Sequence, residues 1–306
     1  MNQEPSAQNC LLEHKVIFNT LSKLYENNKL PNKILLSGEK GIGKTTLAYH
    51  LINFVLSKNE VFTYDSENNT INSENKSYKL IQNKSSPNFY LVDIIEDKKN
   101  IDINQIRGLI VNLNKSSFNS KPRFVLIDNI DLLNTNSINA LLKILEEPNE
   151  NINFILINHN KKVLPTLKSR CLNFKIFLTK EQSIRISNQL LNDNINNLIN
   201  VELLDNYITP GKLYKLIKFS KEYNLDLVNI DLREILKIMI RDKIYKSNNE
   251  IMYSFIELYF RNNISVRNIN LLQLYRYFLI KINNTKIYNL DDESLFMEFE
   301  HKVLNG

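Results

Sequence analysis

The chain has 306 residues, which is long enough for a full α/β domain with one or two smaller domains. Its net charge of +6 and pI near 9.0 are compatible with an acidic partner such as nucleic acid, although a chain so rich in Asn, Lys and Ile also has the bias that an AT-rich genome gives to any protein. It has two cysteines, no membrane-length apolar run and no basic-then-apolar leader, so we expect a cytoplasmic protein without a zinc site, a disulfide framework or a membrane partner.

Helical and strand patterns alternate over the first part of the chain. The alternation predicts a parallel sheet covered by helices, with its ligand at the carboxyl ends of the strands. Within it, the polar stretch 58–87 has the composition of an exposed insertion or a mobile loop with little core-forming capacity. The expected strands are 33–36, 89–92, 124–127, 154–157 and 174–177, and the expected helices are 13–26, 45–56, 104–113 and 137–147.

After residue 177 the strand patterns fade and helical spacing continues to the C-terminus. We therefore divide the chain into an α/β domain at 1–178, a small helical domain at 179–225 and a helical C-terminal domain at 226–306. The helices expected in the last two domains are 179–191, 195–204, 210–223, 232–245, 251–260, 266–282 and 292–304.

Residues 38–45, Gly-Glu-Lys-Gly-Ile-Gly-Lys-Thr, match the phosphate-binding pattern G-x-x-x-x-G-K-[ST] at every fixed position. A strand before the loop and a helix after it argue against a chance match. In such a loop the glycines let successive N–H groups converge on phosphates, in front of the positive end of the next helix. Lys44 is then expected to reach the β- and γ-phosphates and the Thr45 hydroxyl to hold Mg²⁺. The expected nucleotide contacts in this segment are Gly38, Gly41, Gly43, Lys44, Thr45 and Thr46.

The segment Phe124–Asp128 is an apolar strand that ends in an acid, as a Walker B element does. Paired with the upstream loop, Asp128 is expected to lie beside the nucleotide's Mg²⁺. A hydrolytic ATPase of this type usually has Glu next, whereas Asn129 follows here and cannot accept a proton from water. Asp131 is expected to lie in the following turn and to point elsewhere. These residues predict ATP binding with weak or absent hydrolysis.

Residues further along carry a more specific pattern. The segment 139–148 reads N-A-L-L-K-I-L-E-E-P, a strand is expected at 154–157, and 164–171 reads L-P-T-L-K-S-R-C. This arrangement resembles the AAA+ clamp-loader ATPases over about residues 10–220, most strongly over 124–171. Within that family the chain is most similar to the delta-prime subunits of bacterial DNA polymerase III, because of its single-module length, its missing catalytic glutamate and its Ser-Arg-Cys motif.

The resemblance implies roles for individual residues. Arg170 corresponds to an arginine finger that acts in trans on the γ-phosphate bound by a neighbouring subunit, the alternative being an ordinary surface or salt-bridged arginine. Asn158 falls at the sensor-1 position, and Lys212 falls where many members have the sensor-2 arginine. His159 could act as a base or be a hydrogen-bonded structural residue, and Cys171 is expected to pack at the start of the last strand.

The resemblance also implies an architecture and partners. The first two domains become an AAA+ module with a helical lid, and the C-terminal helices become a collar shared with neighbouring subunits. The expected partners are the motor subunits and the clamp-opening subunit of a clamp loader and, through that complex, the sliding clamp and primer-template DNA of the bacterial replication machinery at the nucleoid. ATP and Mg²⁺ are the expected cofactors. The four-cysteine zinc module of many relatives has no counterpart in the 58–87 region.

Three other interpretations remain open. The chain could be the motor ATPase of the same assembly, but Asn129 and the missing cysteines argue against that. It could be a P-loop nucleotide kinase, which would leave the motifs at 139–148 and 169–171 as coincidences. It could also be a structural collar protein with a vestigial nucleotide site.

Overall fold

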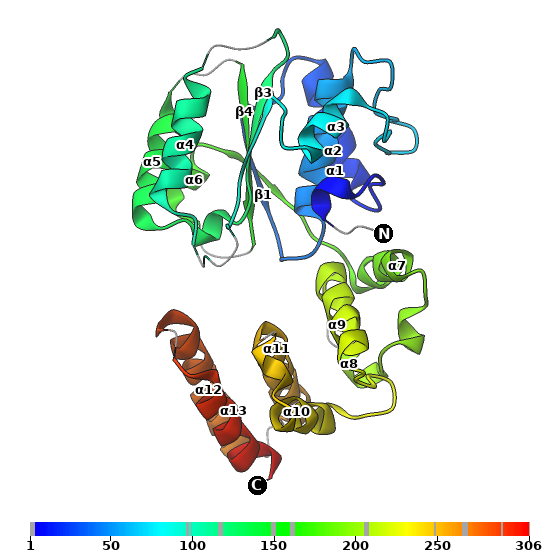
Figure 1. Cartoon of the computed structure of the whole chain (residues 1–306), viewed down its shortest axis with the longest axis vertical. Coiled ribbons are helices and arrows are strands. Elements are labelled where there is room, and N and C mark those ends of the chain that lie inside the picture. The colour runs from blue at the N-terminus through cyan, green and yellow to red at the C-terminus, as the bar shows by residue number, and fades with distance from the viewer. Residues whose placement is uncertain are drawn as a thin grey trace. The chain divides into compact units, whose positions relative to one another are not determined.

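The computed structural model describes residues 4–95, 98, 100–115, 119–147, 151–159, 163–204, 208–247, 249–264, 269–288 and 290–305. The chain separates into two compact units, Met1–Ile186 and Ser187–Gly306 (Figure 1). The further division of the helical part near residue 225 stays a prediction.

A five-stranded parallel sheet in the order β2-β3-β4-β1-β5 forms the centre of the first unit (Figure 1). The expected fold class, a P-loop α/β domain, is therefore confirmed. The predicted position of the last strand was wrong by two residues, because an edge strand with one neighbour does not need a continuous apolar run. The strands are β1 (Lys33–Ser37), β2 (Phe89–Val92), β3 (Arg123–Ile127), β4 (Ile152–Asn158) and β5 (Leu172–Lys175).

Helices cover both faces of this sheet (Figure 1). On one face lie α1 (Lys15–Glu26), α2 (Lys44–Ser57) and α3 (Lys76–Gln82), and on the other α4 (Ile103–Leu113), α5 (Thr135–Glu146) and the short α6 (Pro165–Lys168). Polar side chains start two of them: Asp102 and Gln105 form a capping box on α4, and the Asn134 side chain accepts from the first turn of α5.

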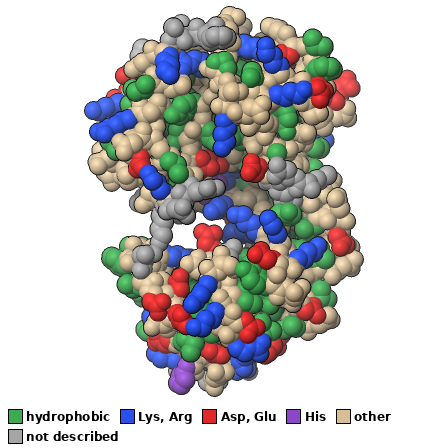
Figure 2. Space-filling model, viewed as in Figure 1, with side chains coloured by type: hydrophobic (Ala, Val, Ile, Leu, Met, Phe, Trp, Pro, Cys, Tyr) green, Lys and Arg blue, Asp and Glu red, His purple; other side chains and the backbone are tan. Residues whose placement is uncertain are grey.

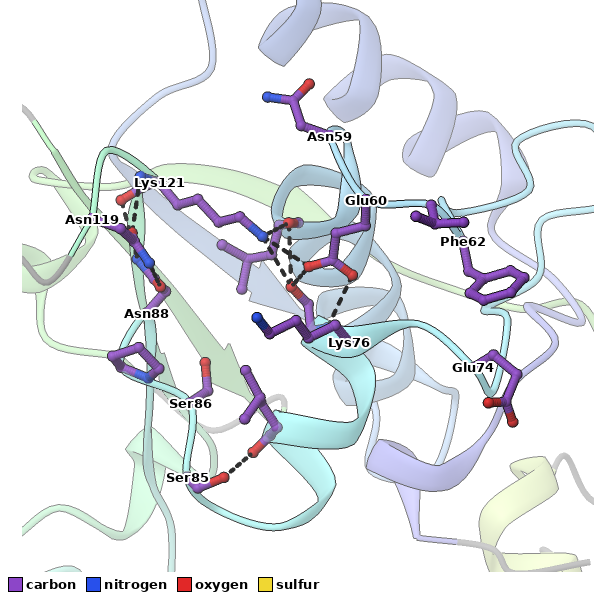
Figure 3. A pocket seen from close by; sticks show the side chains of 15 residues that line it. Asn59, Glu60, Phe62, Glu74, Lys76, Ser85, Ser86, Asn88, Asn119 and Lys121 are labelled. Atoms are coloured by element: carbon purple, nitrogen blue, oxygen red, sulfur yellow. Dashed lines mark hydrogen bonds and ion pairs between the residues drawn. The ribbon is translucent and has the colours of Figure 1, made fainter.

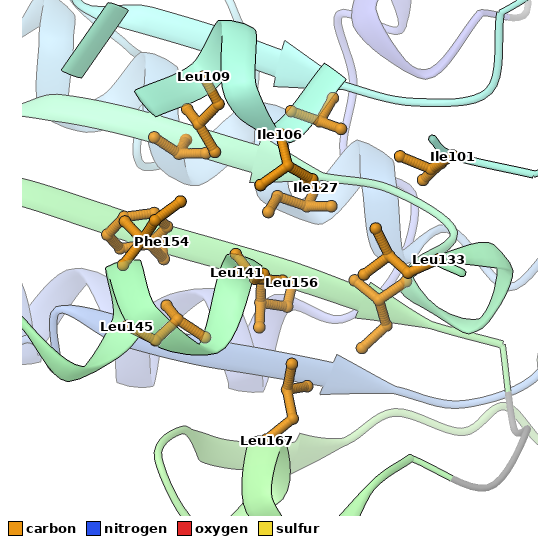
Figure 4. Packing of buried hydrophobic residues seen from close by; sticks show 14 of the residues in the cluster. Ile101, Ile106, Leu109, Ile127, Leu133, Leu141, Leu145, Phe154, Leu156 and Leu167 are labelled. Carbon is orange, nitrogen blue, oxygen red and sulfur yellow. The ribbon is translucent and has the colours of Figure 1, made fainter. Parts of the chain in front are cut away.

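The core under α4 and α5 joins these helices to the central strands (Figure 4). Leu109, Leu141, Phe154 and Leu156 are completely buried there. Apolar positions of α5 recur at helical spacing, while β3 and β4 are apolar at almost every position because both of their faces are covered. The same packing holds the carboxyl ends of these strands in fixed positions.

The polar stretch 58–87 differs from its expected behaviour, since the prediction of little core-forming capacity was wrong. It contains the helix α3, whose N-cap Asn75 accepts a hydrogen bond from the Tyr78 backbone. It also buries three apolar side chains, Tyr64, Ile71 and Ile81. These anchors are too widely spaced to produce a periodic pattern in the sequence.

The second unit is helical, and α7 (Lys180–Leu191) contains the boundary that leads into it. The helix expected at 195–204 is two short pieces, and the one expected at 232–245 ends early, because Lys243 adopts a left-handed conformation with φ 53°. No helix among the described residues is long and apolar enough to cross a membrane. The remaining helices are α8 (Val201–Leu204), α9 (Pro210–Glu222), α10 (Leu232–Arg241), α11 (Asn249–Asn263), α12 (Ile269–Tyr288) and α13 (Asp292–Phe299), with short turns at Pro5–Ala7, Ile130–Leu132, Ile195–Asn197, Ile244–Lys246 and Glu300–Leu304.

Candidate nucleotide site

Strand order determines which residues meet at the site. Because β4 lies between β1 and β3, the end of β4 separates the loop that follows β1 from the acid that follows β3. The register pairs Ser37 with Asn158 and Ile127 with Leu156. Three chain segments that are far apart in the sequence therefore end side by side at the carboxyl edge of the sheet, where ligands of such sheets bind.

The glycines of the loop meet two different requirements. Gly41 and Gly43 have φ of 90° and 91°, values that L side chains rarely adopt. Gly38 is needed for space, because a Cβ there would lie 2.2 Å from the Ile176 carbonyl oxygen. The backbone N–H of Gly38 also donates to the Asn158 carbonyl at 3.3 Å. The loop is thus fixed on the sheet edge from both of its sides.

His14 braces the loop from the N-terminal side, a role that the sequence did not indicate. It caps α1 in a left-handed conformation with φ 69°, and its Nε2 lies 2.6 Å from the Ile42 carbonyl oxygen. Burial lowers the pKa of His14, which favours a neutral ring that donates this hydrogen bond. Without a motif around residue 14, the contact follows only from the folded chain.

Lys44 starts α2 and has only 2% of its surface exposed. Its ammonium donates to the carbonyls of Gly38, at 2.9 Å, and Glu39, and it lies 3.1 Å from His159 Nδ1. Burial lowers the pKa of Lys44 to about 8, while the negative charges of Asp128, Asp131 and Glu39 act in the opposite direction. The ammonium therefore keeps its charge at neutral pH although it is buried.

Thr45 and Asp128, the two residues expected to face the nucleotide's Mg²⁺, contact each other directly. The Thr45 hydroxyl donates to Asp128 Oδ2 at 2.8 Å. Burial alone would raise the pKa of Asp128, but hydrogen bonds from His159, Thr45 and the Asn129 backbone outweigh it and lower the pKa. A hydroxyl and an ionised carboxylate are oxygen ligands that suit Mg²⁺ in a phosphate site. In the part of the chain that the structure describes, no cluster of three His, Cys, Asp or Glu side chains forms a metal site by itself.

Asn129 and Asp131 follow β3 closely. Asn129 comes directly before the short turn Ile130–Leu132, and Asp131 lies within that turn. Asn129 is left-handed, with φ 55°, and its amide donates to Asp93 Oδ1 at 2.8 Å. Asp131 lies in the turn as expected, but it does not point away from the site, since its Oδ1 accepts from the backbone N–H of His159 at 3.4 Å. Burial and the nearby Asp128 charge raise the pKa of Asp93.

His159 occupies the centre of the arrangement, directly after β4. Its Nδ1 faces the Lys44 ammonium at 3.1 Å, and its Nε2 faces Asp128 Oδ1 at 3.3 Å. Since an ammonium can only donate, the network assigns the lone pair to Nδ1 and the proton to Nε2. The hydrogen-bonded alternative for His159 is thus what the structure contains. Its place between two motif residues was not visible in the sequence.

Arg170 lies in the turn between α6 and β5, at the amino ends of the strands and therefore at the end of the sheet opposite the loop. It pairs with Glu146 and donates to the Thr166 carbonyl at 2.6 Å, and its side chain is 32% exposed. Cys171 precedes β5 and packs against the core, and burial raises the pKa of its thiol to about 11. A thiol that is neutral at physiological pH agrees with a packing role.

The other expected contacts are less closely joined to this network. Thr46 follows Thr45 in the first turn of α2 and is half-buried. Asn158 is buried at the end of β4, beside the loop. Lys212 is exposed on α9 in the second unit, and its sensor-2 role stays a prediction.

A cavity of about 860 Å³ lies beside the far end of α2 (Figure 3). The Lys121 ammonium contacts Glu60 at 2.8 Å and the Leu56 carbonyl at 2.6 Å there. The 14 residues of α2 separate this cavity from the loop by about 20 Å at 1.5 Å per residue. The cavity lining is Leu56, Asn59, Glu60, Val61, Phe62, Glu74, Lys76, Ser77, Leu80, Ser85, Ser86, Pro87, Asn88, Asn119 and Lys121.

Lys and Arg side chains are scattered among other types on the face seen in Figure 2.

Known proteins were compared with the chain by sequence and by fold. A family described as "DNA polymerase III, delta subunit" matches residues 13–179, more than half of the chain. The DNA polymerase III subunit delta' of Buchnera aphidicola subsp. Schizaphis graminum is 25% identical over 281 residues, which cover 87% of this chain and 83% of that protein. The subunit gamma of the same organism is 30% identical over 181 residues, 59% of this chain and 47% of that protein, so the chain spans about half of its length.

A solved structure has a similar fold over most of the chain. It is a DNA polymerase III gamma subunit-related protein from Thermotoga maritima, with a TM-score of 0.55 and 21% sequence identity. The match covers 92% of this chain and 96% of that one. At this identity the likeness concerns the fold alone, and it agrees with the α/β unit followed by helices.

Proposed function

Because the chain belongs to the family of DNA polymerase III subunits whose match covers residues 13–179, we propose that it is the delta-prime-type subunit of a clamp loader. In this role it works in a complex with motor subunits and a clamp-opening subunit. The complex hydrolyses ATP and loads the sliding clamp on primed DNA. The observation that carries the proposal is a phosphate loop with left-handed glycines near Asn129, combined with Arg170 at the opposite ends of the strands.

The loop and its neighbours fit ATP with Mg²⁺. The left-handed glycines leave the backbone free of side chains where phosphates would approach, and Lys44 supplies the buried positive charge. Thr45 and Asp128, already 2.8 Å apart, would hold the metal, which when bound neutralises phosphate charge. Gly38, Gly41 and Thr46 complete the proposed loop contacts, with Asn158 and Lys212 as the two sensors.

Asn129 limits what this site can do to the nucleotide. An amide cannot take the proton of an attacking water, and this amide is engaged by Asp93. Asp131 is close to the site, but it accepts a hydrogen bond from the His159 backbone. We therefore expect the chain to bind ATP with weak or absent turnover.

The position of Arg170 favours action on another subunit. The register of β5 with β1 pairs Leu172 with Ile34, so Arg170 is level with the residues before β1. The loop lies beyond Ser37, about 20 Å further along at 3.3 Å per residue, which is out of reach of an arginine side chain. On the exterior of its own domain, this guanidinium is available to the γ-phosphate in a neighbouring subunit's site once it leaves Glu146.

Reconstitution tests the proposal most directly. The chain is mixed with the motor and clamp-opening subunits of the same organism, and ATP hydrolysis by the purified complex is measured on primed DNA with the clamp present. Arg170→Ala should lower the rate by about 10³-fold or more per site that it serves, without changing this chain's own ATP affinity. The matched control is Arg107→Ala, which removes an exposed arginine of α4. A complex that fails to assemble, or one that hydrolyses ATP at the unchanged rate with Arg170→Ala, contradicts the proposal.

Two rival functions have their own assays. Single-turnover hydrolysis by the isolated chain, beside Asn129→Glu, separates a binding subunit from a motor, and fast unaided turnover by the wild type would favour the motor. Phosphorylation of a nucleoside monophosphate by the pure chain would favour a nucleotide kinase.

A further inference from the structure

The Lys44 ammonium has no N–H group left for a phosphate. An ammonium has three donors and no acceptor, and three acceptors surround this one in the described part of the chain. They are the carbonyl oxygens of Gly38 and Glu39 and the Nδ1 atom of His159. A phosphate oxygen can therefore receive a hydrogen bond from Lys44 only if one of the three is given up.

The three acceptors are not equivalent. Gly38 and Glu39 belong to the phosphate loop itself, whose backbone is fixed against Ile176 and Asn158. His159 comes from a different segment, the end of β4, and it reaches Lys44 only with its side chain. A change of side-chain torsion is enough to withdraw an imidazole, whereas withdrawal of a carbonyl requires the loop to rebuild.

His159 also joins the remaining groups of the site into one series of hydrogen bonds. Its Nε2 donates to Asp128 Oδ1 at 3.3 Å, and the other oxygen of Asp128 accepts from Thr45 at 2.8 Å. The side chains of His159 and Asp128 are each 11% exposed, so water competes weakly for these bonds. The lysine, the hydroxyl and the carboxylate that would meet a nucleotide and its metal are thus all tied together through this imidazole.

We propose that His159 is a positioning residue that occupies the phosphate-binding donor of Lys44 in the nucleotide-free chain and is displaced by the nucleotide's phosphate. This inference rests on the proposed nucleotide site and adds its regulation. The contact lowers nucleotide affinity, because binding must first break a hydrogen bond between a buried cation and its acceptor.

The first test measures binding of a non-hydrolysable ATP analogue with Mg²⁺ to the full chain by calorimetry. His159→Ala should bind the analogue about fivefold more tightly, since a hydrogen bond to a charged group no longer has to be broken. His159→Gln should stay near the wild type, because its amide offers Lys44 an acceptor and Asp128 a donor. Adenosine, which has no phosphate, should bind equally to all three. Unchanged or weaker analogue binding by His159→Ala overturns the inference, as does an equal gain in affinity by His159→Gln.

A separate variant shows whether the proposed nucleotide function, rather than the role of His159, is wrong. Lys44→Ala should lose most of its affinity for the analogue, and if wild type and Lys44→Ala bind equally, the proposed nucleotide function fails. A second measurement then still tests the contact without nucleotide. Reductive methylation of Lys44, followed by mass spectrometry, should be several-fold faster in His159→Ala than in the wild type or His159→Gln, and equal rates contradict the proposal.

Discussion

The free energy of unfolding should depend strongly on pH below neutrality, because His50 is protonated more readily in the unfolded chain than in the folded one. His50 lies on α2 and is completely buried, with Nδ1 2.9 Å from the Tyr64 hydroxyl and Nε2 3.0 Å from the Gln8 carbonyl. The neutral ring suits this place, because Nε2–H donates to the carbonyl and Nδ1 accepts from the hydroxyl. Burial lowers the pKa of His50 from 6.5 to about 4, although the hydrogen bond with Gln8 acts to raise it.

The sign of the effect follows from proton binding. Between pH 6.5 and 4 the unfolded chain protonates at His50 and the folded chain does not, so stability falls as pH falls through this range. At 1.36 kcal/mol per pKa unit, the loss amounts to about 3 kcal/mol at pH 4. Above pH 6.5 the group contributes no pH dependence.

Urea denaturation of the wild type and His50→Gln at pH 7.5, 6, 5 and 4.5 measures this loss. His50→Gln should be the less stable protein at pH 7.5, because it disturbs two buried hydrogen bonds, and the difference should shrink or reverse by about 2.5 kcal/mol between pH 7.5 and pH 4.5. His301→Gln, at an exposed position, is the matched control and should follow the wild type. If the difference between wild type and His50→Gln stays constant within about 0.5 kcal/mol over the whole range, the reasoning is refuted.

Three shorter predictions concern packing and charge. Gly38→Ala forces a Cβ to within 2.2 Å of the Ile176 carbonyl and should cost about 3 kcal/mol in urea denaturation, so a loss below about 1 kcal/mol would contradict the geometry. Leu141→Ala, at a completely buried position of α5, should cost about 3 kcal/mol, and a Tm equal to that of the wild type would argue against the core. Hydrogen bonds from Lys281, the larger cause, and from Lys302 lower the pKa of Glu298 from 4.5 to about 2. The stabilisation of the fold by the ionised Glu298 is therefore complete above pH 4.5 and is lost as the pH falls towards 2. Because the site is partly exposed, Glu298→Gln should cost about 1 kcal/mol at pH 7 and little at pH 2, as thermal unfolding at both pH values can check.

The sequence determined the parts of this protein that depend on neighbours along the chain. The phosphate loop was visible because its glycines, lysine and threonine must follow one another at fixed spacing, and Gly41 and Gly43 indeed adopt left-handed conformations. The strands β1 to β4 and most helices followed from apolar periodicity, which is also local. The same local signal failed for the polar stretch 58–87, whose three buried anchors are isolated among polar residues.

The tertiary structure alone decided what surrounds the loop. His14 meets Ile42 across 28 residues, and His159 meets Lys44 across 115 residues. The second contact exists because β4 is inserted between β1 and β3, and the order of strands in a parallel sheet is set by the packing of the whole domain. The parallel register of β5 with β1 places Arg170 at the amino ends of the strands, opposite the loop. The motifs therefore predicted a nucleotide site, while the tertiary structure determined that a histidine contacts its lysine and that Arg170 lies at the opposite ends of the strands.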